Sequence, residues 1–139
     1  MDRISISKRE WEEGEEGVTF LIDGRDLIDM IQGSGGRADI LLVRSICYAR
    51  EDTVFREHSR LLDERLVVLA CVCGSPHCTS ITVRIQRLET MVIWSDFAPA
   101  WLGAATGFPE VGPFTFARDD YEEMLQMGRG FCRRFEARG

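Results

Sequence analysis

The fold is decided by the stretch Leu66-Val67-Val68-Leu69-Ala70-Cys71-Val72-Cys73, in which every side chain is apolar. Such a run predicts a strand that is covered on both faces. Apolar and polar side chains then alternate in residues 79–87, and residues 91–97 are again rich in β-favouring types. This order predicts a three-strand antiparallel meander whose first strand is central and whose second strand is half-exposed.

Upstream of the meander, the sequence predicts a β-hairpin over residues 3–10 and 17–23. Apolar side chains alternate with polar ones in both segments, and the acidic, glycine-containing residues 12–17 separate them. Asp23-Gly24 is a turn signal after the second strand. A short helix follows, and the glycine-rich residues 33–36 are expected to end it.

Downstream of the meander, glycine and proline residues predict an irregular loop over residues 98–113. Loops of this length often carry binding residues, although a packed surface loop is the simpler interpretation. A final helix is expected from Arg118, with two aspartates in its first turn. Gly128 and Gly130 are expected to weaken or end that helix.

These elements predict one α+β domain over residues 1–139. An antiparallel sheet, made of the N-terminal hairpin and the three-strand meander, is expected to pack against the C-terminal helix and the one short helix. At 139 residues the chain is long enough for a core of its own, without disulfides or metals for stability.

Charge and composition exclude several classes of partner. The net charge of −6, from 23 acidic and 17 basic side chains, disfavours nucleic acid, because phosphate binding needs a basic face. No run reaches the roughly eighteen apolar residues of a membrane helix, and the start lacks the apolar core of a signal peptide. We therefore expect a cytoplasmic protein with neither nucleic acid nor membrane as its partner. Five cysteines without the spacing of a secreted scaffold predict mostly free thiols, with metal ligation as the main exception.

Candidate metal ligands cluster in Cys71-Val72-Cys73-Gly74-Ser75-Pro76-His77-Cys78, which holds three of the five cysteines and one of the two histidines. Zinc takes four ligands, and Cys71, Cys73, His77 and Cys78 supply that number. However, structural zinc sites usually draw their ligands from two separated pairs, so a distant residue is an alternative fourth ligand. The distant candidates are Cys47, His58 and Cys132.

Two other interpretations of this segment stay open. A redox site would need an activated thiolate, and His77 beside Cys78 is a weak sign of one, since the expected hairpin offers no helix dipole. In a purely structural role, Cys71 and Cys73 would be small apolar residues of a buried strand, while glycine and proline shape the turn.

A second candidate site lies in Trp94-Ser95-Asp96-Phe97, where a hydroxyl and a carboxylate stand beside a large aromatic side chain. Neighbouring residues of a strand face opposite sides, so Ser95 and Asp96 are not expected to form a directly facing pair. Asp96 is instead expected to be a turn or cap acceptor. An enzyme would need a pocket that joins these two residues to the loop at residues 98–113.

Two further patterns have plain structural explanations. Asp23, Asp26 and Asp29 recur every three residues, as metal-binding carboxylates can, but a helix start with acids on its exposed face explains them better. Core packing is the default for the aromatic residues near the irregular loop, which are Trp94, Trp101 and Phe108.

Four short motifs resemble those of an uncharacterised family of small bacterial proteins. The motifs are DGRDL at residues 23–27, CVCGSPHC at 71–78, VIWSDF at 92–97 and GPFTFARDDYEEML at 112–125. That family has a C-x-C-G-x3-C loop, then a V-x-W-S-D-F strand and a G-P-F-x-F segment before a C-terminal helix. The resemblance covers roughly residues 18–126 and implies a small α+β domain without implying an activity.

The chain departs from that family at three places. Thr79 stands where the family commonly has tryptophan, and Ala117 stands where an acidic residue is expected. Residues 98–100 are Ala-Pro-Ala instead of polar and basic side chains. A family site that used those side chains would be altered in this chain.

The function expected from the sequence is that of a cytoplasmic interaction or regulatory domain without catalytic activity, with another protein as its partner. One alternative is a zinc-binding domain centred on residues 71–78, and zinc is the only cofactor considered. A second alternative is a small enzyme with a site near Asp96. A homo-oligomer is compatible with the sequence.

Overall fold

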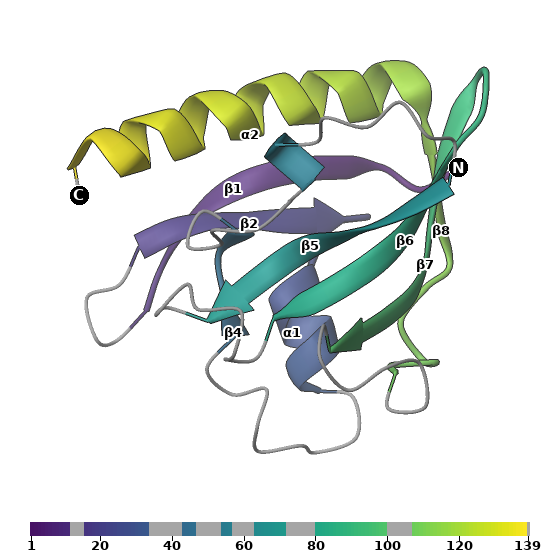
Figure 1. Cartoon of the computed structure of the whole chain (residues 1–139), viewed down its shortest axis with the longest axis horizontal. Coiled ribbons are helices and arrows are strands. Elements are labelled where there is room, and N and C mark those ends of the chain that lie inside the picture. The colour runs from purple at the N-terminus through teal and green to yellow at the C-terminus, as the bar shows by residue number, and fades with distance from the viewer. Residues whose placement is uncertain are drawn as a thin grey trace.

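The computed structural model describes residues 1–11, 16–33, 43–46, 54–56, 63–71, 80–99 and 107–138. In these residues the fold is α+β, as expected, with two antiparallel sheets, a short helix and a long C-terminal helix (Figure 1). In chain order the elements are β1 (Ile4–Glu10), β2 (Glu16–Ile22), β3 (Arg25–Asp26), α1 (Leu27–Gln32), β4 (Val43–Arg44), the 3₁₀ turn η3 (Val54–Arg56), β5 (Asp63–Cys71), β6 (Ile81–Arg87), β7 (Met91–Pro99), β8 (Phe114–Ala117) and α2 (Arg118–Arg138).

The expected N-terminal hairpin is confirmed. Strands β1 and β2 pair antiparallel, and the short β3 extends this sheet on the far side of β2. The turn before β3 uses Asp23 and Gly24 with φ of 53° and 80°, a left-handed conformation that aspartate tolerates and glycine favours. Asp26 then caps α1, accepting a hydrogen bond of 2.8 Å from the Ile28 backbone, and Gly33 ends the helix as expected.

The meander is also confirmed, as the centre of a five-stranded sheet in the order β4-β5-β6-β7-β8. Strand β8 at one edge lies in residues to which the sequence pattern assigned no element. Strand β6 is more buried than its alternation predicted, because Thr82 is only 8% exposed between the buried residues Ile81 and Val83. The Thr82 side chain is covered because it bonds to side-chain and backbone groups of both neighbouring strands.

The two sheets are joined at both ends. At one end, Asp2 bridges Phe116 beside β8, and its backbone N–H donates to the Thr115 carbonyl at 2.7 Å. At the other end, the Ser45 hydroxyl after β4 accepts a hydrogen bond of 3.0 Å from the Val18 backbone in β2. The described strands therefore enclose a large hydrophobic core, with a separate small cluster of Val67 and Ala70, and α2 and α1 lie on opposite sides of them (Figure 1).

Trp94 of β7 is the centre of that core and is fully buried. Its ring makes edge contacts with Phe20 of β2 and Phe116 of β8, both with ring centroids 5.4 Å apart, and with Tyr121 of α2 at 5.9 Å. The indole N–H also donates to the Tyr121 hydroxyl at 3.2 Å. One residue thus ties both sheets to the long helix, and core packing of Trp94 is confirmed.

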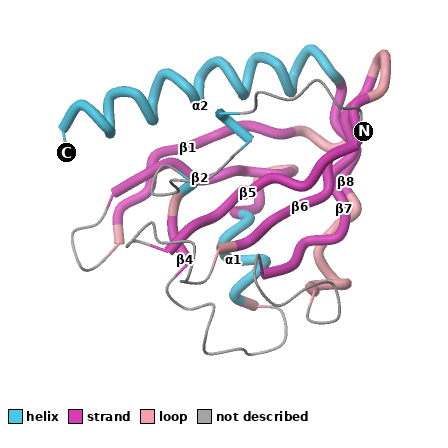
Figure 2. Tube along the Cα trace, viewed as in Figure 1, coloured by secondary structure: helices cyan, strands magenta, loops and turns pink. Residues whose placement is uncertain are grey.

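Helix α2 does not end at its glycines, so the expectation that Gly128 or Gly130 ends it was wrong. The helix runs without a break from Arg118 to Arg138 (Figure 2). Gly128 has no room for a side chain, because the Phe55 ring of η3 occupies the space a Cβ would take. Arg129 next to it donates a 2.9 Å hydrogen bond to the Phe55 carbonyl. Tertiary packing therefore outweighs the low helix propensity of glycine here.

Candidate functional site

The candidate site lies where β7 departs from regular pairing with β6. Arg84 pairs with Ser95, but the next pair along the ladder is Thr82 with Ala98. Asp96 and Phe97 are thus together opposite the single residue Val83, which makes a β-bulge. Asp96 has φ of 54°, a left-handed conformation that is uncommon for residues with a side chain, although aspartate tolerates it, as at Asp23.

Side chains hold the bulge in place where the regular ladder is lost. Arg65 of β5 reaches across β6, and its Nη1 donates to the Thr82 hydroxyl and to the Asp96 carbonyl, both at 2.8 Å. The Thr82 hydroxyl in turn donates to the Ala98 carbonyl at 3.1 Å. Two carbonyls of β7 thus accept hydrogen bonds from side chains, and a strained backbone conformation is held by its surroundings.

A cleft of about 460 Å³ opens beside this bulge, and we call it the bulge cleft. Residues 95–98 of β7 form one wall, residues 107–109 and 111–113 form another, and Arg65 completes the lining. The backbone N–H of Phe108 donates to the Phe97 carbonyl at 2.8 Å, which fixes the two walls against each other. The volume is in the range of small-ligand and side-chain pockets.

The floor of the bulge cleft is apolar, and its charged groups are few. Phe97, Phe108 and Val111 line it and are buried, at 1%, 3% and 6% exposure. The side chain of Asp96 is exposed, and its carboxylate has no hydrogen bond or ion pair with any part of the chain that the structure describes. The cleft therefore combines apolar contact area with one unpaired negative charge.

Two predictions about this segment need correction. Ser95 and Asp96 were expected to face opposite sides, yet both line the bulge cleft, because the bulge interrupts the strand alternation. Asp96 was expected to accept a turn or cap hydrogen bond, and among the described residues its carboxylate accepts none. Sequence reasoning also missed Arg65 and Thr82, because nothing local to either residue indicates a partner on β7.

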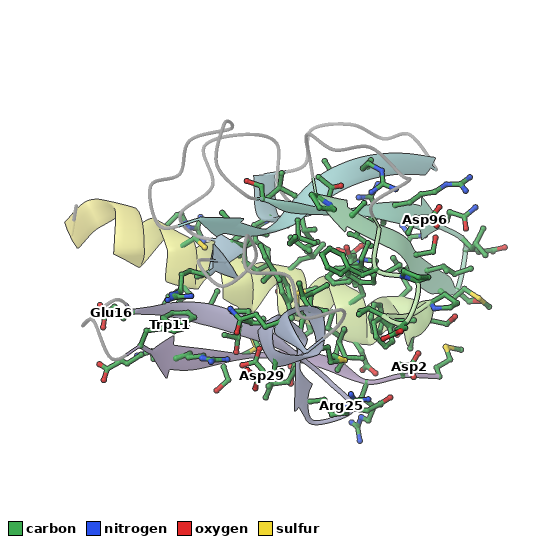
Figure 3. The ribbon with its side chains drawn as sticks, turned by 90° about the horizontal axis from the view of Figure 1, so that it is seen from below. Asp2, Trp11, Glu16, Arg25, Asp29 and Asp96 are labelled. Carbon is green, nitrogen blue, oxygen red and sulfur yellow. The ribbon has the colours of Figure 1, made fainter. Side chains whose placement is uncertain are left out.

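A second depression, which we call the acidic hollow, has a volume of about 540 Å³ and shares Val111, Gly112 and Pro113 with the bulge cleft. Its charged lining residues are Asp2, Asp23, Asp29, Glu110 and Arg25. Figure 3 shows Asp96, Asp2 and Arg25 toward one end of the long axis of the molecule, with Trp11 and Glu16 at the other.

The three regularly spaced aspartates have structural partners, as their position at a helix start predicted. Asp23 accepts a 2.8 Å hydrogen bond from the Arg3 backbone, and this bond lowers the pKa of Asp23. Asp26 and Asp29 both form ion pairs with Arg9, at 2.9 and 3.1 Å. Among the described residues no group of three or more histidine, cysteine or acidic side chains is placed to hold a metal ion.

The cysteine segment lies mostly outside the described residues. Strand β5 ends at Cys71, and its pairing with β6 is the hairpin expected on either side of the segment. Cys73, His77 and Cys78, like Cys47 and His58, fall outside the description, so zinc at this segment stays a prediction. Elemental analysis of protein purified without added metal tests it directly.

Cys132 of α2 is the one cysteine whose side chain is described, and it differs from expectation. It is buried, with 8% exposure, and it is disulfide-bonded. The sequence predicted mostly free thiols and considered Cys132 as a distant zinc ligand. A sulfur in a disulfide is not available as a thiolate ligand, so this residue is removed from the candidate zinc shell in the oxidised protein.

Comparisons with family models, with curated proteins and with solved structures found no match to this chain. The resemblance to a bacterial family therefore stays an expectation from motifs. Neither helix in the described part of the chain has both the length and the apolar character needed to cross a membrane.

Proposed function

We propose that this chain is an interaction or regulatory domain without catalytic activity, and that it binds another protein through the bulge cleft. The observation that carries the proposal is the Asp96 carboxylate, which is exposed and unpaired in the described structure beside buried aromatic side chains. Such a site suits recognition, because apolar walls give contact area and a single charged group fixes orientation.

The chemistry of the cleft favours binding over catalysis. Its described lining holds one carboxylate, on Asp96, and one hydroxyl, on Ser95, and the guanidinium of Arg65 stays charged at any physiological pH. Acid–base catalysis usually needs two groups of different proton affinity that converge on one substrate. A single carboxylate next to a cation is better suited to holding a charged group than to moving its proton.

Affinity capture with a matched pair of variants tests this proposal. Pro109 is exposed and lines the bulge cleft, so Pro109→Arg places a long side chain at its rim. Gln126→Arg adds the same charge on an exposed position of α2 and is the control. We expect the tagged wild-type protein and Gln126→Arg to recover a stoichiometric protein partner from lysate of the native host. Pro109→Arg should recover at least about tenfold less.

Two results would contradict this function. One is equal recovery of the partner by Pro109→Arg, which would place binding elsewhere. The other is recovery of no partner together with a small molecule that co-purifies tightly with the protein. Circular dichroism of each variant checks that the fold is intact before the captures are compared.

One observation favours testing the enzyme alternative. The bulge cleft joins Ser95 and Asp96 to residues 107–113, which is the arrangement that this alternative requires. A fluorophosphonate probe tests whether Ser95 is an activated nucleophile. Labelling of the wild-type protein but not of Ser95→Ala would support the enzyme, and an unlabelled Ser95 would remove a serine-based mechanism.

A further inference from the structure

The bulge cleft holds a carboxylate whose orientation is set by side chains that do not bond to it. The Arg65 guanidinium contacts the backbone carbonyl of Asp96 at 2.8 Å and forms no ion pair with the Asp96 carboxylate. The same nitrogen also donates to Thr82, so both N–H groups of Nη1 are used within the sheet, while Nε and Nη2 keep their donors. The Asp96 carboxylate itself has no hydrogen-bond or ion-pair partner in the described structure.

The backbone at Asp96 is held in a conformation that exposes this carboxylate. A φ of 54° in a bulge directs a side chain differently from a regular strand, and bulges often re-aim side chains at binding sites. Strained backbone of this kind persists where the surroundings determine it, here through Arg65 and Thr82. The observed outlier thus points to a role for the Asp96 carboxylate in binding.

Charge complementarity identifies the kind of group that this carboxylate would meet. The acidic hollow, which shares a wall with the bulge cleft, is lined by Asp2, Asp23, Asp29 and Glu110 against the single base Arg25. The whole chain also carries a net charge of −6. With Asp96 and Arg65 included, the linings of the two depressions hold five carboxylates against two guanidinium groups, and this excess of negative charge favours a cationic partner.

The apolar residues of the bulge cleft indicate that the basic group of the partner is flanked by hydrophobic residues. Phe97, Phe108 and Val111 form the packed floor behind the cleft surface, and the apolar surface open to a partner is that of the exposed Pro109 and Pro113. A free inorganic cation gains nothing from such walls. A lysine or arginine side chain does gain from them, because its aliphatic stem packs on apolar surface while its charged end reaches a carboxylate.

We propose that the bulge cleft binds an exposed segment of a partner protein in which a lysine or arginine is flanked by apolar residues, with the basic side chain paired to the Asp96 carboxylate. This inference rests on the proposed function and names the chemistry of the partner at that same site.

Two synthetic peptides test the proposal, acetyl-Ala-Leu-Lys-Leu-Ala-amide and the same peptide with glutamate in place of lysine. Each is titrated into ¹⁵N-labelled full-length protein to about 10 mM, which reaches millimolar dissociation constants. We expect the lysine peptide to shift the amide signals of Asp96, Phe108 and Val111, and the glutamate peptide to leave them unchanged.

A matched pair of variants assigns the effect to Asp96. Asp96→Asn removes the charge while keeping the fold, because asparagine tolerates the left-handed conformation well. It should weaken binding of the lysine peptide at least about tenfold. Glu89→Gln removes the same charge at an exposed position between β6 and β7 that lines neither depression, and it should change binding by less than about twofold.

Three results with the peptides would overturn the proposal. They are binding of the glutamate peptide as tightly as the lysine peptide, unchanged binding by Asp96→Asn, and no shift of the cleft signals with either peptide. Equal binding of n-butylammonium would assign the cleft to a small organic cation and would overturn it too. A captured partner that is lost in Pro109→Arg but retained in Asp96→Asn would leave the proposed function standing and remove only this inference.

Discussion

The two halves of β7 differ in how they pair with neighbouring strands and in whether their side chains are packed in the core or exposed at a cleft. In the first half, residues 91–94 pair in register with β6 and β8, and Trp94 is buried among aromatic side chains from both sheets and α2. In the second half, the bulge at Asp96 breaks the register, and the chain exposes a carboxylate beside an apolar cleft. Regular pairing and the burial of Val92 and Trp94 serve stability in one half. Irregular backbone and an unpaired charge indicate binding in the other.

The link between the halves is Phe97. Its ring contacts Trp94 with ring centroids 6.3 Å apart, and the same residue lines the bulge cleft. The cleft floor is therefore an extension of the rigid core. A site built on packed elements keeps its shape better than one carried by loops alone, so the core fixes the geometry that the bulge exposes.

The largest expected effect is that of Trp94→Ala, which removes the centre of the core. We expect the free energy of unfolding to fall by about 3–5 kcal/mol, from lost burial and the cavity left behind. Ser95→Ala, one residue along, should change it by less than about 0.5 kcal/mol, since Ser95 is half-buried and its hydroxyl has no hydrogen bond with the rest of the described chain. Urea unfolding followed by circular dichroism measures both. Similar losses in the free energy of unfolding at the two positions would contradict the proposed difference between the two halves of β7.

The next effect concerns Tyr121, whose buried hydroxyl accepts the hydrogen bond from Trp94. Tyr121→Phe leaves the indole N–H without this acceptor and should lower the free energy of unfolding by about 1–3 kcal/mol at neutral pH.

The same substitution has a pH signature. Burial raises the pKa of Tyr121 above its ordinary value of 10.0, although the Trp94 hydrogen bond and Arg87 act in the opposite direction. The folded state thus holds its proton more tightly than the unfolded state. The stability from this group is present below pH 10 and is lost above it, by up to about 1.4 kcal/mol per pH unit. Urea unfolding between pH 8 and 11 should show this loss in the wild-type protein and not in Tyr121→Phe. The same alkaline slope in both proteins would contradict the assignment.

A smaller effect is expected in the second half of β7, for Thr82→Val. The change keeps the volume but removes the hydroxyl that bonds to Arg65 and Ala98. We expect a loss of about 0.5–1.5 kcal/mol in the free energy of unfolding, because Arg65 keeps its second acceptor on Asp96. Amide hydrogen exchange should speed up in residues 95–98 and stay unchanged in residues 91–94. Uniform acceleration along β7 would mean that the bulge is not held locally.

The smallest effect is expected for Asp96→Gly. Glycine adopts a φ of 54° without steric strain but has more freedom in the unfolded chain, so these terms oppose each other. We expect the free energy of unfolding to rise or stay within about 1 kcal/mol, while binding of the lysine peptide is lost. Asp96→Ala keeps a Cβ in the strained position and should be less stable than Asp96→Gly. A large loss of stability in Asp96→Gly would show that the carboxylate has a structural role.

Most of the sheet was predictable from the sequence, because strand alternation and turn residues are local signals. The hairpin at residues 3–10 and 17–23, the meander, and the start of α2 at Arg118 all follow from such patterns. The continuation of α2 past Gly128 was not predictable, since it depends on Phe55, which lies far away in sequence and fills the space beside that glycine.

The candidate site was only half predictable. The sequence indicated Asp96 and Ser95 as candidates, yet it placed them on opposite faces because a regular strand alternates. The bulge that joins them is held by Arg65, whose bond to the Asp96 carbonyl spans 31 positions of the chain. Pairings of this kind follow from the assembled sheet, and no local pattern encodes them.

The bridge between Asp2 and the segment before α2 has a consequence for how the molecule is made. The backbone N–H of Asp2 donates to Thr115, and the Thr115 N–H donates to the Asp2 carboxylate at 2.9 Å, across 113 positions of the chain. During synthesis the N-terminal hairpin leaves the ribosome long before its neighbour β8 exists. The edge of β1 next to β8 therefore has no neighbouring strand until residues 114–117 have been translated. Contacts of such long range slow folding, so a nascent chain of this protein is expected to depend on the completion of translation more than a helical protein of its size would.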